Sequence, residues 1–401
     1  MSEVYWDPFD VALDDSPYET WRRMRDERPI YRNERYDFWA LSRYADVEAA
    51  HRDPGTYSSA YGTVLETMGP GMSDTGMMIF LDPPEHTRLR HLVSRAFTPR
   101  RVQGLEGRIR QICAELLDQA HEQPTFDYVQ DFGAILPSRV ISTLLGVPPA
   151  DQEDQRKVVD NLFHLEPGAG MINDVSITAA LTLIAYLRDL LAERHRHPQE
   201  DLLSALSAAE IDEGGVARRL TLDEAASFAV LLFTAGTETV ARLLGNAAVI
   251  LAEHPDQRRE LAERTSLIPD AIEELLRYEA PSPVQGRWTT RPVDLYGTAV
   301  PANSKVLLLT GSAGRDDRAY PEPERFDIHR RFDQHVSFGY GIHFCVGAAL
   351  ARLEGRVALE ETLRRYRAWE VDLAGARRLH TSTVRGWESV PIQLRPDTRT
   401  G

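Results

Sequence analysis

Phe338-Gly-Tyr-Gly-Ile-His-Phe-Cys-Val-Gly347 is the most informative stretch of this 401-residue chain. Its glycines let the backbone turn tightly and come close to a bulky group. Cys345 stands just before an expected helix, whose positive end and free N–H groups stabilise a thiolate. Such a thiolate is a nucleophile or a metal ligand. A buried structural cysteine is the ordinary alternative, and no nucleophile–base pattern accompanies this thiol.

The same stretch resembles the haem-binding signature of the cytochrome P450 superfamily, Phe-Gly-x-Gly-x-His-x-Cys-x-Gly, at every position. The resemblance implies a haem b cofactor with Cys345 as the axial iron ligand, and a thiolate ligand favours O–O cleavage. It assigns His343 to a haem propionate and Phe338 to the shielding of the sulfur. Gly339 and Gly347 are further expected contacts of the cofactor.

The longest expected helix runs from Thr221 to about Glu253. Thr221-Leu-Asp-Glu224 fits a capping box at its start, and His254-Pro255 supplies its end. Residues 228–235 are apolar nearly all round, which indicates that the helix is buried there.

Ala235-Gly-Thr-Glu-Thr239 lies near the middle of this helix and resembles the oxygen-activation segment of the superfamily. By this resemblance, Gly236 opens a groove for dioxygen and Thr239 hydrogen-bonds iron-bound oxygen. Glu238 relays protons through water in the general-acid role. Taken alone, the segment also fits a polar interruption tolerated in a solvated helix.

Several segments coincide with substrate-contact regions of the superfamily. The residues expected to line the pocket are Leu231, Thr234, Ala235, Val284, Gln285, Val384, Met77 and Met78. Methionine adapts to irregular apolar shapes, although ordinary core filling is the alternative reading of the two methionines. Together these residues predict a sizeable apolar substrate, such as a polyketide, a terpenoid, a steroid or a macrocycle.

His86 and Arg90 are four residues apart and share one face of an expected helix. A solvated basic face is the alternative. The resemblance assigns both side chains to haem propionates, with Arg287 as a third cationic partner, because arginine–carboxylate pairs orient a ligand strongly.

Glu274-Leu-Leu-Arg277 is, on its own, an ordinary pair on one helix face. In the superfamily this motif is a buried ion pair, joined by the arginine of a later Pro-x-Arg-Phe segment. That arginine is Arg325 here, within Pro323-Glu-Arg-Phe326. We expect these three residues to be structural.

The composition narrows the class of protein. Acidic residues outnumber basic ones by 61 to 46, which gives a net charge of −15 and argues against nucleic-acid binding. The chain has two cysteines, Cys113 and Cys345, which are too few for a disulfide framework. They are also far apart in sequence, so a structural zinc site is not expected. No signal peptide and no run of 18 apolar residues is found, so a cytoplasmic protein without a membrane span is expected.

The helical pattern dominates, and short strands occur near 30–41, 293–310 and 389–393. The fold class is therefore mainly α with a small β portion from both chain ends. By resemblance this is the P450 fold, a triangular helical body around a buried haem with a long central helix. We expect one domain over residues 1–401, a frayed tail at 396–401, and a monomer.

The segment from His86 to Arg101 has five arginines and no acid, which contrasts with the net charge. A solvated helix is one reading, and a docking surface for an acidic redox partner is the other. The chain has no flavin or iron–sulfur motif of its own. By resemblance, a ferredoxin and its NAD(P)H-dependent reductase supply electrons, and the candidate docking residues are Arg88, Arg95, Arg100, Arg101 and Arg352.

The expected function is that of a haem-thiolate monooxygenase, which uses O2 and two electrons to hydroxylate, epoxidise or cyclise an apolar small molecule. Secondary metabolism or the oxidation of steroids or xenobiotics would be its setting. A haem-thiolate ligand-binding or sensor protein without turnover is the alternative, and the acid–alcohol pair Glu238–Thr239 argues against it.

Overall fold

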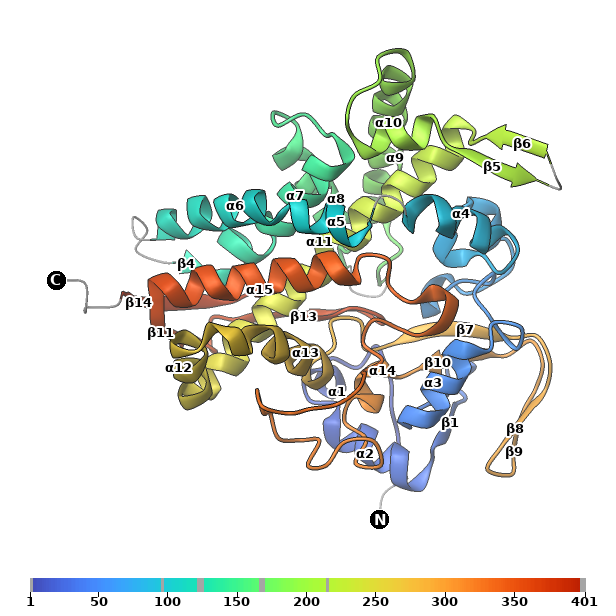
Figure 1. The fold of residues 1–401 in the computed structure, drawn as a ribbon. Coiled ribbons are helices and arrows are strands. Elements are labelled where there is room, and N and C mark those ends of the chain that lie inside the picture. Colours follow the sequence, from blue (N-terminus) through green and yellow to red (C-terminus); the bar gives the residue numbers. More distant parts are fainter. Residues whose placement is uncertain (1–2, 95–96, 121–125, 166–169, 214–215, 397–401) are drawn as a thin grey trace.

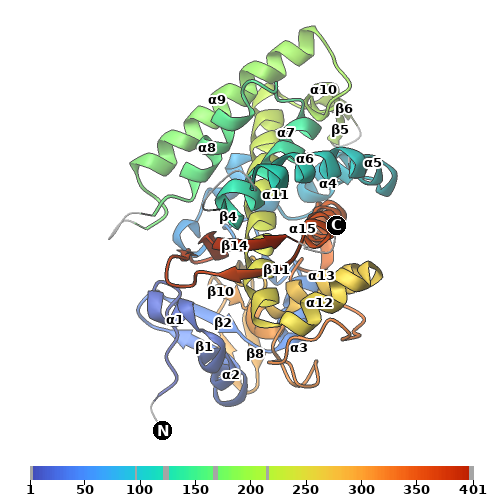
Figure 2. The ribbon, with the colours of Figure 1, turned by 90° about the vertical axis from the view of Figure 1, so that its left-hand side faces the viewer.

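The computed structural model describes residues 3–94, 97–120, 126–165, 170–213 and 216–396 (Figures 1 and 2). The helices of the first half are α1 (Val11–Asp15), α2 (Tyr18–Glu27), α3 (Tyr44–Arg52), α4 (Glu85–Ser94), α5 (Pro99–Gly104), α6 (Glu106–Gln119), α7 (Ile135–Leu145), α8 (Gln152–Leu162), α9 (Asp174–Arg196) and α10 (Leu202–Ser207). Those of the second half are α11 (Leu222–Glu253), α12 (Pro255–Glu263), α13 (Ile268–Tyr278), α14 (Thr310–Ala313) and α15 (Ala348–Arg365).

The shorter elements complete this arrangement. The strands are β1 (Ile30–Asn33), β2 (Phe38–Leu41), β3 (Tyr57–Ser58), β4 (Phe126–Asp127), β5 (Glu210–Glu213), β6 (Val216–Arg219), β7 (Gln285–Thr289), β8 (Val293–Leu295), β9 (Thr298–Val300), β10 (Lys305–Leu308), β11 (Tyr366–Val371), β12 (Arg377–His380), β13 (Arg385–Ser389) and β14 (Pro391–Pro396). The 3-10 helices are η1 (Leu65–Thr67), η2 (Met72–Thr75), η3 (Met78–Phe80), η6 (Thr265–Leu267) and η7 (Gly341–His343), and η5 (Tyr128–Gly133) is a π-helix.

The long helix α11 crosses the middle of the molecule (Figure 2). Its predicted capping box is confirmed: the Glu224 N–H donates to the Thr221 hydroxyl (3.2 Å), and the Thr221 N–H donates to the Glu224 carboxylate (2.7 Å). The helix packs against α7, α9, α15 and β13, and most of its side chains are buried. Because it contacts so many elements, α11 fixes the position of any group carried at its midpoint.

The main sheet joins distant parts of the chain in the order β1-β2-β10-β7-β3. β2 and β10 are parallel, with Phe38 opposite Lys305, and β7 pairs with β10 so that Arg287 lies opposite Val306. A second sheet has the order β11-β14-β4. The expected β portion from both chain ends is thus confirmed, and it lies with α1, α2 and α3 at one end of the molecule (Figure 1).

Some predicted boundaries differ from the structure. The pattern Ser42-Arg-Tyr-Ala predicts a helix capped by Ser42, but the N-cap of α3 is Arg43, and the Ser42 hydroxyl donates to the Pro29 carbonyl. The helix expected from Cys345 begins at Ala348. Pro396 ends β14 and does not belong to a frayed tail, and residues 397–401 lie outside the described part of the chain.

Two helices, α9 and α11, have the length and hydropathy of a membrane-spanning segment. Within the fold, α11 is 72% buried over that stretch and α9 is 33% buried. The long apolar core of α11 is therefore covered by its neighbours, and the absence of a membrane span stays a prediction.

Candidate functional site

The cysteine loop, residues 338–347, leads from the body of the protein into α15. The Cys345 N–H donates to the Phe338 carbonyl (2.9 Å), which closes the loop. Gly339 and Gly341 have φ values of 68° and 66°, in the left-handed region that favours glycine. A Cβ atom on Gly341 would also collide with the backbone oxygen of His51. The glycines therefore let the loop lie directly against α3.

Backbone N–H groups and two guanidinium groups lie near the thiol of Cys345. Burial raises its pKa, while the backbone N–H groups of Gly347 and Ala348 and the guanidinium groups of Arg90 and Arg352 lower it. Arg352 also lies over the Phe338 ring, 4.6 Å from its centroid. A metal ion at this sulfur would displace the thiol proton, and the same donors would stabilise the resulting thiolate.

Two histidines and two arginines predicted for the cofactor gather beside this loop. The rings of His86 and His343 have centroids 4.3 Å apart. Arg287 is 4% exposed, and its Nη1 donates to the Gly286 carbonyl (2.7 Å). Among the described residues, no carboxylate lies within ion-pair distance of Arg287 or Arg90. The structure thus brings these four side chains together without a negative partner.

A third histidine, His51 of α3, belongs to this group and was missed by the sequence analysis. Its Nδ1 is 3.5 Å from Nη2 of Arg287, and its ring lies 3.7 Å from the place of a Cβ on Gly339. His51 is 4% exposed, and its Nε2 has no hydrogen-bond partner among the described residues. The ring is therefore positioned at the edge of the cysteine loop.

The electrostatic state of this cluster is unfavourable by itself. Burial and neighbouring cations lower the pKa of His343 to about 2 and that of His51 to about 3. Burial also lowers the pKa of His86 to about 4 and that of Arg287 to about 10. Buried cations and unpaired ring nitrogens are costly. A cofactor with two carboxylates fits here, because it would supply acceptors and negative charge.

The middle of α11 presents Ala235 and Thr239 on an accessible face, although the helix is otherwise buried. The Thr239 hydroxyl donates to the Ala235 carbonyl (3.1 Å). A Cβ on Gly236 would lie 3.0 Å from Cγ1 of Ile141, so this glycine permits close approach of α7. The groove for dioxygen expected at Gly236 therefore stays a prediction.

The carboxylate of Glu238 points to another side of α11. It accepts a hydrogen bond from Nε of Arg242 (2.7 Å), and both side chains are buried. Arg242 also donates to the Trp387 carbonyl of β13. The acid predicted for proton transfer is thus held in an ion pair on the β13 side of the helix.

A family model settles what this arrangement belongs to: residues 30–382 match the model described as Cytochrome P450. The chain belongs to the cytochrome P450 family. P450 proteins bind haem b, and this P450 is an oxidoreductase of the monooxygenase class. The cluster without carboxylates next to Cys345 fits that cofactor, because haem carries two propionates and needs one axial sulfur.

Relatives with assigned names agree with this membership. The chain is 41% identical over 395 residues to a protein of Mycobacterium tuberculosis H37Rv named cytochrome P450 123, covering 98% of this chain and 97% of that one. It is 39% identical over 375 residues to erythromycin C-12 hydroxylase of Saccharopolyspora erythraea, covering 92% of each. A solved structure of a mutant P450 EryK with erythromycin B has a TM-score of 0.87 at 35% identity, covering 97% of this chain and 99% of that one.

The P450's predicted pocket residues come from several elements. Leu231 and Thr234 are half-buried on α11, and the Thr234 hydroxyl has no partner within the described residues. The Thr383 hydroxyl donates to the Val284 carbonyl (2.9 Å), so Val284 lies near the chain segment that carries Val384, although the two valines are far apart in sequence. Both valines are buried, so they offer an apolar surface.

The other three residues predicted to line the pocket, Met77, Met78 and Gln285, lie in different surroundings. Met77 is half-buried and Met78 is 6% exposed within the main core, so core packing describes Met78 well. The Gln285 side-chain oxygen lies 3.7 Å from the place of a Cβ on Gly339. Gln285 therefore lies beside the cysteine loop, where it suits the P450 cofactor better than an apolar substrate.

The prediction for Arg325 is wrong. Glu274 and Arg277 do form the expected ion pair, fully buried, at 2.6 and 2.8 Å. The guanidinium that joins this pair is that of Arg330, whose Nε lies 3.1 Å from the Glu274 carboxylate. Arg325 contributes only its backbone carbonyl, which accepts from Arg277. The Arg325 side chain points toward Glu322 and solvent. The loop path decides this, because the Asp327 N–H also donates to Glu274 (3.0 Å).

Proposed function

We propose that this P450 hydroxylates a sizeable apolar small molecule, with O2 and with electrons from a ferredoxin and its NAD(P)H-dependent reductase. One observation carries the proposal: Cys345 lies beside a cluster of histidines and arginines whose Arg90 and Arg287 form no ion pair among the described residues. We also infer a monomeric, cytoplasmic enzyme of secondary metabolism with a single domain. The single domain is supported by the pairing of β2 with β10, since these two strands are far apart in sequence.

Each side chain of the site has a part in this proposal. Bound haem with a thiolate ligand supplies the activation of dioxygen. Cys345 would hold the iron, and Phe338 would shield the sulfur. The propionates are held by His51, His86, Arg90, Arg287 and His343. These donors fix the orientation of the cofactor because charge-assisted hydrogen bonds are strong and directional.

Proton transfer falls to α11. Thr239 presents its hydroxyl on the accessible face and exchanges its bond to the Ala235 carbonyl for one to the reacting oxygen. Because the carboxylate of Glu238 is held by Arg242, it must first leave that ion pair; it can then take up a proton from solvent water and pass it on. Until that step, Arg242 holds the carboxylate in the ion pair.

The substrate class rests on the apolar lining and on the relatives. Leu231, Val284 and Val384 offer aliphatic surface. One relative is named erythromycin C-12 hydroxylase, and one matched structure is a P450 in complex with erythromycin B. We therefore favour a macrocyclic polyketide, with terpenoids and steroids as the next classes to assay.

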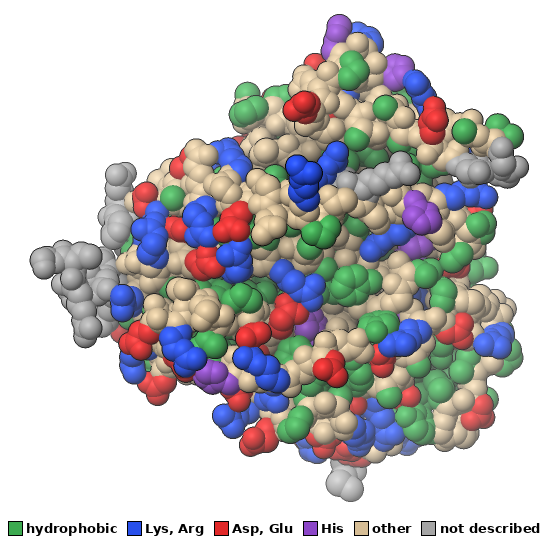
Figure 3. All heavy atoms as spheres, viewed as in Figure 1, with side chains coloured by type: hydrophobic (Ala, Val, Ile, Leu, Met, Phe, Trp, Pro, Cys, Tyr) green, Lys and Arg blue, Asp and Glu red, His purple; other side chains and the backbone are tan. Residues whose placement is uncertain are grey.

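The redox partner is proposed to dock on the face that carries α4, α5 and α15. Arg100 and Arg101 are exposed on α5, and Arg88 lies 3.7 Å from Glu85. Arg352 is paired with Glu273, and Arg95 lies outside the described residues. Figure 3 shows basic and acidic side chains interspersed on this side of the protein. The docking surface is therefore restricted to a few arginines, with Arg100 and Arg101 as its main candidates.

An optical titration of the ferric protein tests the function. Macrolides, aromatic polyketides, terpenoids, steroids and fatty acids are added in turn, and a low-to-high-spin shift identifies the class that displaces water from the iron. Product formation with NADH, ferredoxin and reductase then separates a monooxygenase from a haem-thiolate sensor. A Cys345→Ala variant that kept the thiolate spectrum of the reduced carbon-monoxide complex would overturn the proposed ligand.

A further inference from the structure

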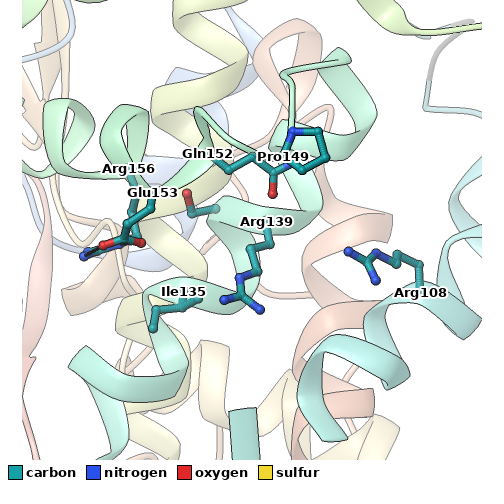
Figure 4. Close-up of a pocket in the computed structure, with 8 residues that line it drawn as sticks. Arg108, Ile135, Arg139, Pro149, Gln152, Glu153 and Arg156 are labelled. Carbon is teal, nitrogen blue, oxygen red and sulfur yellow. Dashed lines mark hydrogen bonds and ion pairs between the residues drawn. The ribbon is translucent and has the colours of Figure 1, made fainter. Parts of the chain in front are cut away.

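A pocket of about 200 Å³ lies between α6, α7 and α8 (Figure 4). None of the residues that line it belongs to the haem site described above. Three of them are arginines from three different helices: Arg108 of α6, Arg139 of α7 and Arg156 of α8. On a protein of net charge −15, this concentration of positive charge requires a reason.

Arg156 is fully engaged by carboxylates. Its Nε and Nη2 donate to Glu153 (3.0 and 2.8 Å), and its Nη1 donates to Asp160 (2.5 Å). Glu153 is the acid on the rim of the pocket, and it is neutralised by this arginine. The positive charge of Arg156 is therefore already compensated, and Arg108 and Arg139 are the two guanidinium groups that could bind an anion in the pocket.

Arg108 and Arg139 lack comparable partners. No hydrogen bond or ion pair is formed by Arg108 within the described chain, and the nearest carboxylate oxygen to Arg139 is that of Glu115, at 3.7 Å. Both side chains line the pocket, Arg108 from α6 and Arg139 from α7 (Figure 4). Like charges that share a pocket repel each other, and a bound anion would remove this repulsion.

Ser138 supplies an independent indication. It lines the same pocket and is 1% exposed, yet its hydroxyl has no hydrogen-bond partner among the residues described. Buried hydroxyl groups are nearly always paired. An oxyanion in the pocket would accept a hydrogen bond from this hydroxyl.

We propose that the pocket binds a phosphate-class dianion, either as inorganic phosphate or as the monoester of a small molecule. Guanidinium groups match phosphate oxygens with paired hydrogen bonds. The pocket volume is that of several water molecules at about 30 Å³ each, which admits a phosphoryl group with a short substituent. Bound there, the dianion links Arg108 of α6 to Arg139 of α7.

Calorimetry on the haem-loaded protein tests this site. Inorganic phosphate and glycerol 3-phosphate are titrated separately at constant ionic strength, into the native protein and into Arg108→Gln and Ser138→Ala variants. The matched control is Arg188→Gln, an exposed arginine of α9 that lies outside the pocket. Arg108 is exposed and forms no hydrogen bond or ion pair among the described residues, so its substitution should leave folding intact and report on binding.

We expect saturable binding at one site, weakened about tenfold by Arg108→Gln and unchanged by Arg188→Gln. Tighter binding of glycerol 3-phosphate identifies a small-molecule ester as the ligand, and equal binding identifies free phosphate. The bound dianion also raises the unfolding midpoint of the native protein. Heats without saturation, or equal affinity in the native protein and Arg108→Gln, overturn the proposal.

Discussion

Nε of Arg242 donates a 2.7 Å hydrogen bond to the carboxylate of Glu238, one turn earlier on the same helix, with both side chains buried. The pair joins the proposed proton donor of this P450 to β13, because Arg242 also donates to the Trp387 carbonyl. Proton transfer by Glu238 therefore requires this contact to open.

Removing one partner of this pair leaves a buried charge alone. We expect Arg242→Gln and Glu238→Gln each to lower the free energy of unfolding by about 3–5 kcal/mol. The double variant should be more stable than the sum of the two losses predicts, as measured by urea unfolding of the haem-loaded protein. Additive losses would show that the two side chains do not interact.

Thr239→Val removes the hydroxyl while keeping the shape of the side chain. Because the hydroxyl guides protons, we expect hydroxylated product per NAD(P)H to fall at least about tenfold, with more hydrogen peroxide released. Thr239→Ser is the matched control and should retain most of the coupling. Unchanged coupling in the valine variant would remove Thr239 from proton transfer.

His51→Phe tests the third histidine of the cofactor cluster. The loss of a donor to a propionate should increase the rate of haem transfer to apomyoglobin about tenfold. His329→Phe, a half-exposed histidine paired with Glu260, serves as the control. A transfer rate equal to that of the native protein would limit His51 to packing against Gly339.

Arg330→Met and Arg325→Met separate the two arginines near Glu274. Arg330 contacts the fully buried carboxylate, so its loss should cost about 3 kcal/mol of unfolding free energy. Arg325→Met should change stability by less than about 0.5 kcal/mol, because its side chain is 62% exposed. The opposite order would restore the original assignment of Arg325.

Glu273 predicts a pH dependence of stability. Burial raises its pKa, but His335 and Arg352 outweigh burial and lower it to about 2. The folded pKa lies below the unfolded value of about 4.3. The stabilisation by the ionised carboxylate is therefore fully present above about pH 4.3, and it is lost as the pH falls toward 2. Glu273→Gln should therefore cost about 2 kcal/mol at pH 7 and about half as much at pH 3, in urea unfolding. The exposed Glu263→Gln should show no such difference.

The features that sequence predicted well depend on local patterns. The capping box of Thr221 and Glu224 fixes the start of α11, and the glycines around Cys345 fix the loop. The i,i+4 spacing of Glu238 and Arg242 also carries a usable signal, which the sequence analysis did not draw on.

The features that sequence missed depend on long-range contacts. Arg325 and Arg330 lie in one loop, and only the path of that loop brings Arg330 to Glu274. His51 reaches the site because α3 packs against the loop at Gly341. Neither contact has a local pattern that would have predicted it.

The parallel pairing of Phe38 in β2 with Lys305 in β10 has a consequence for biosynthesis. The β1–β2 hairpin emerges from the ribosome early and must wait for most of the chain before its outer edge is covered. Such late, non-local pairing is slow and leaves a strand edge available for aggregation. During that interval, the growing chain depends on chaperones more than a finished molecule does.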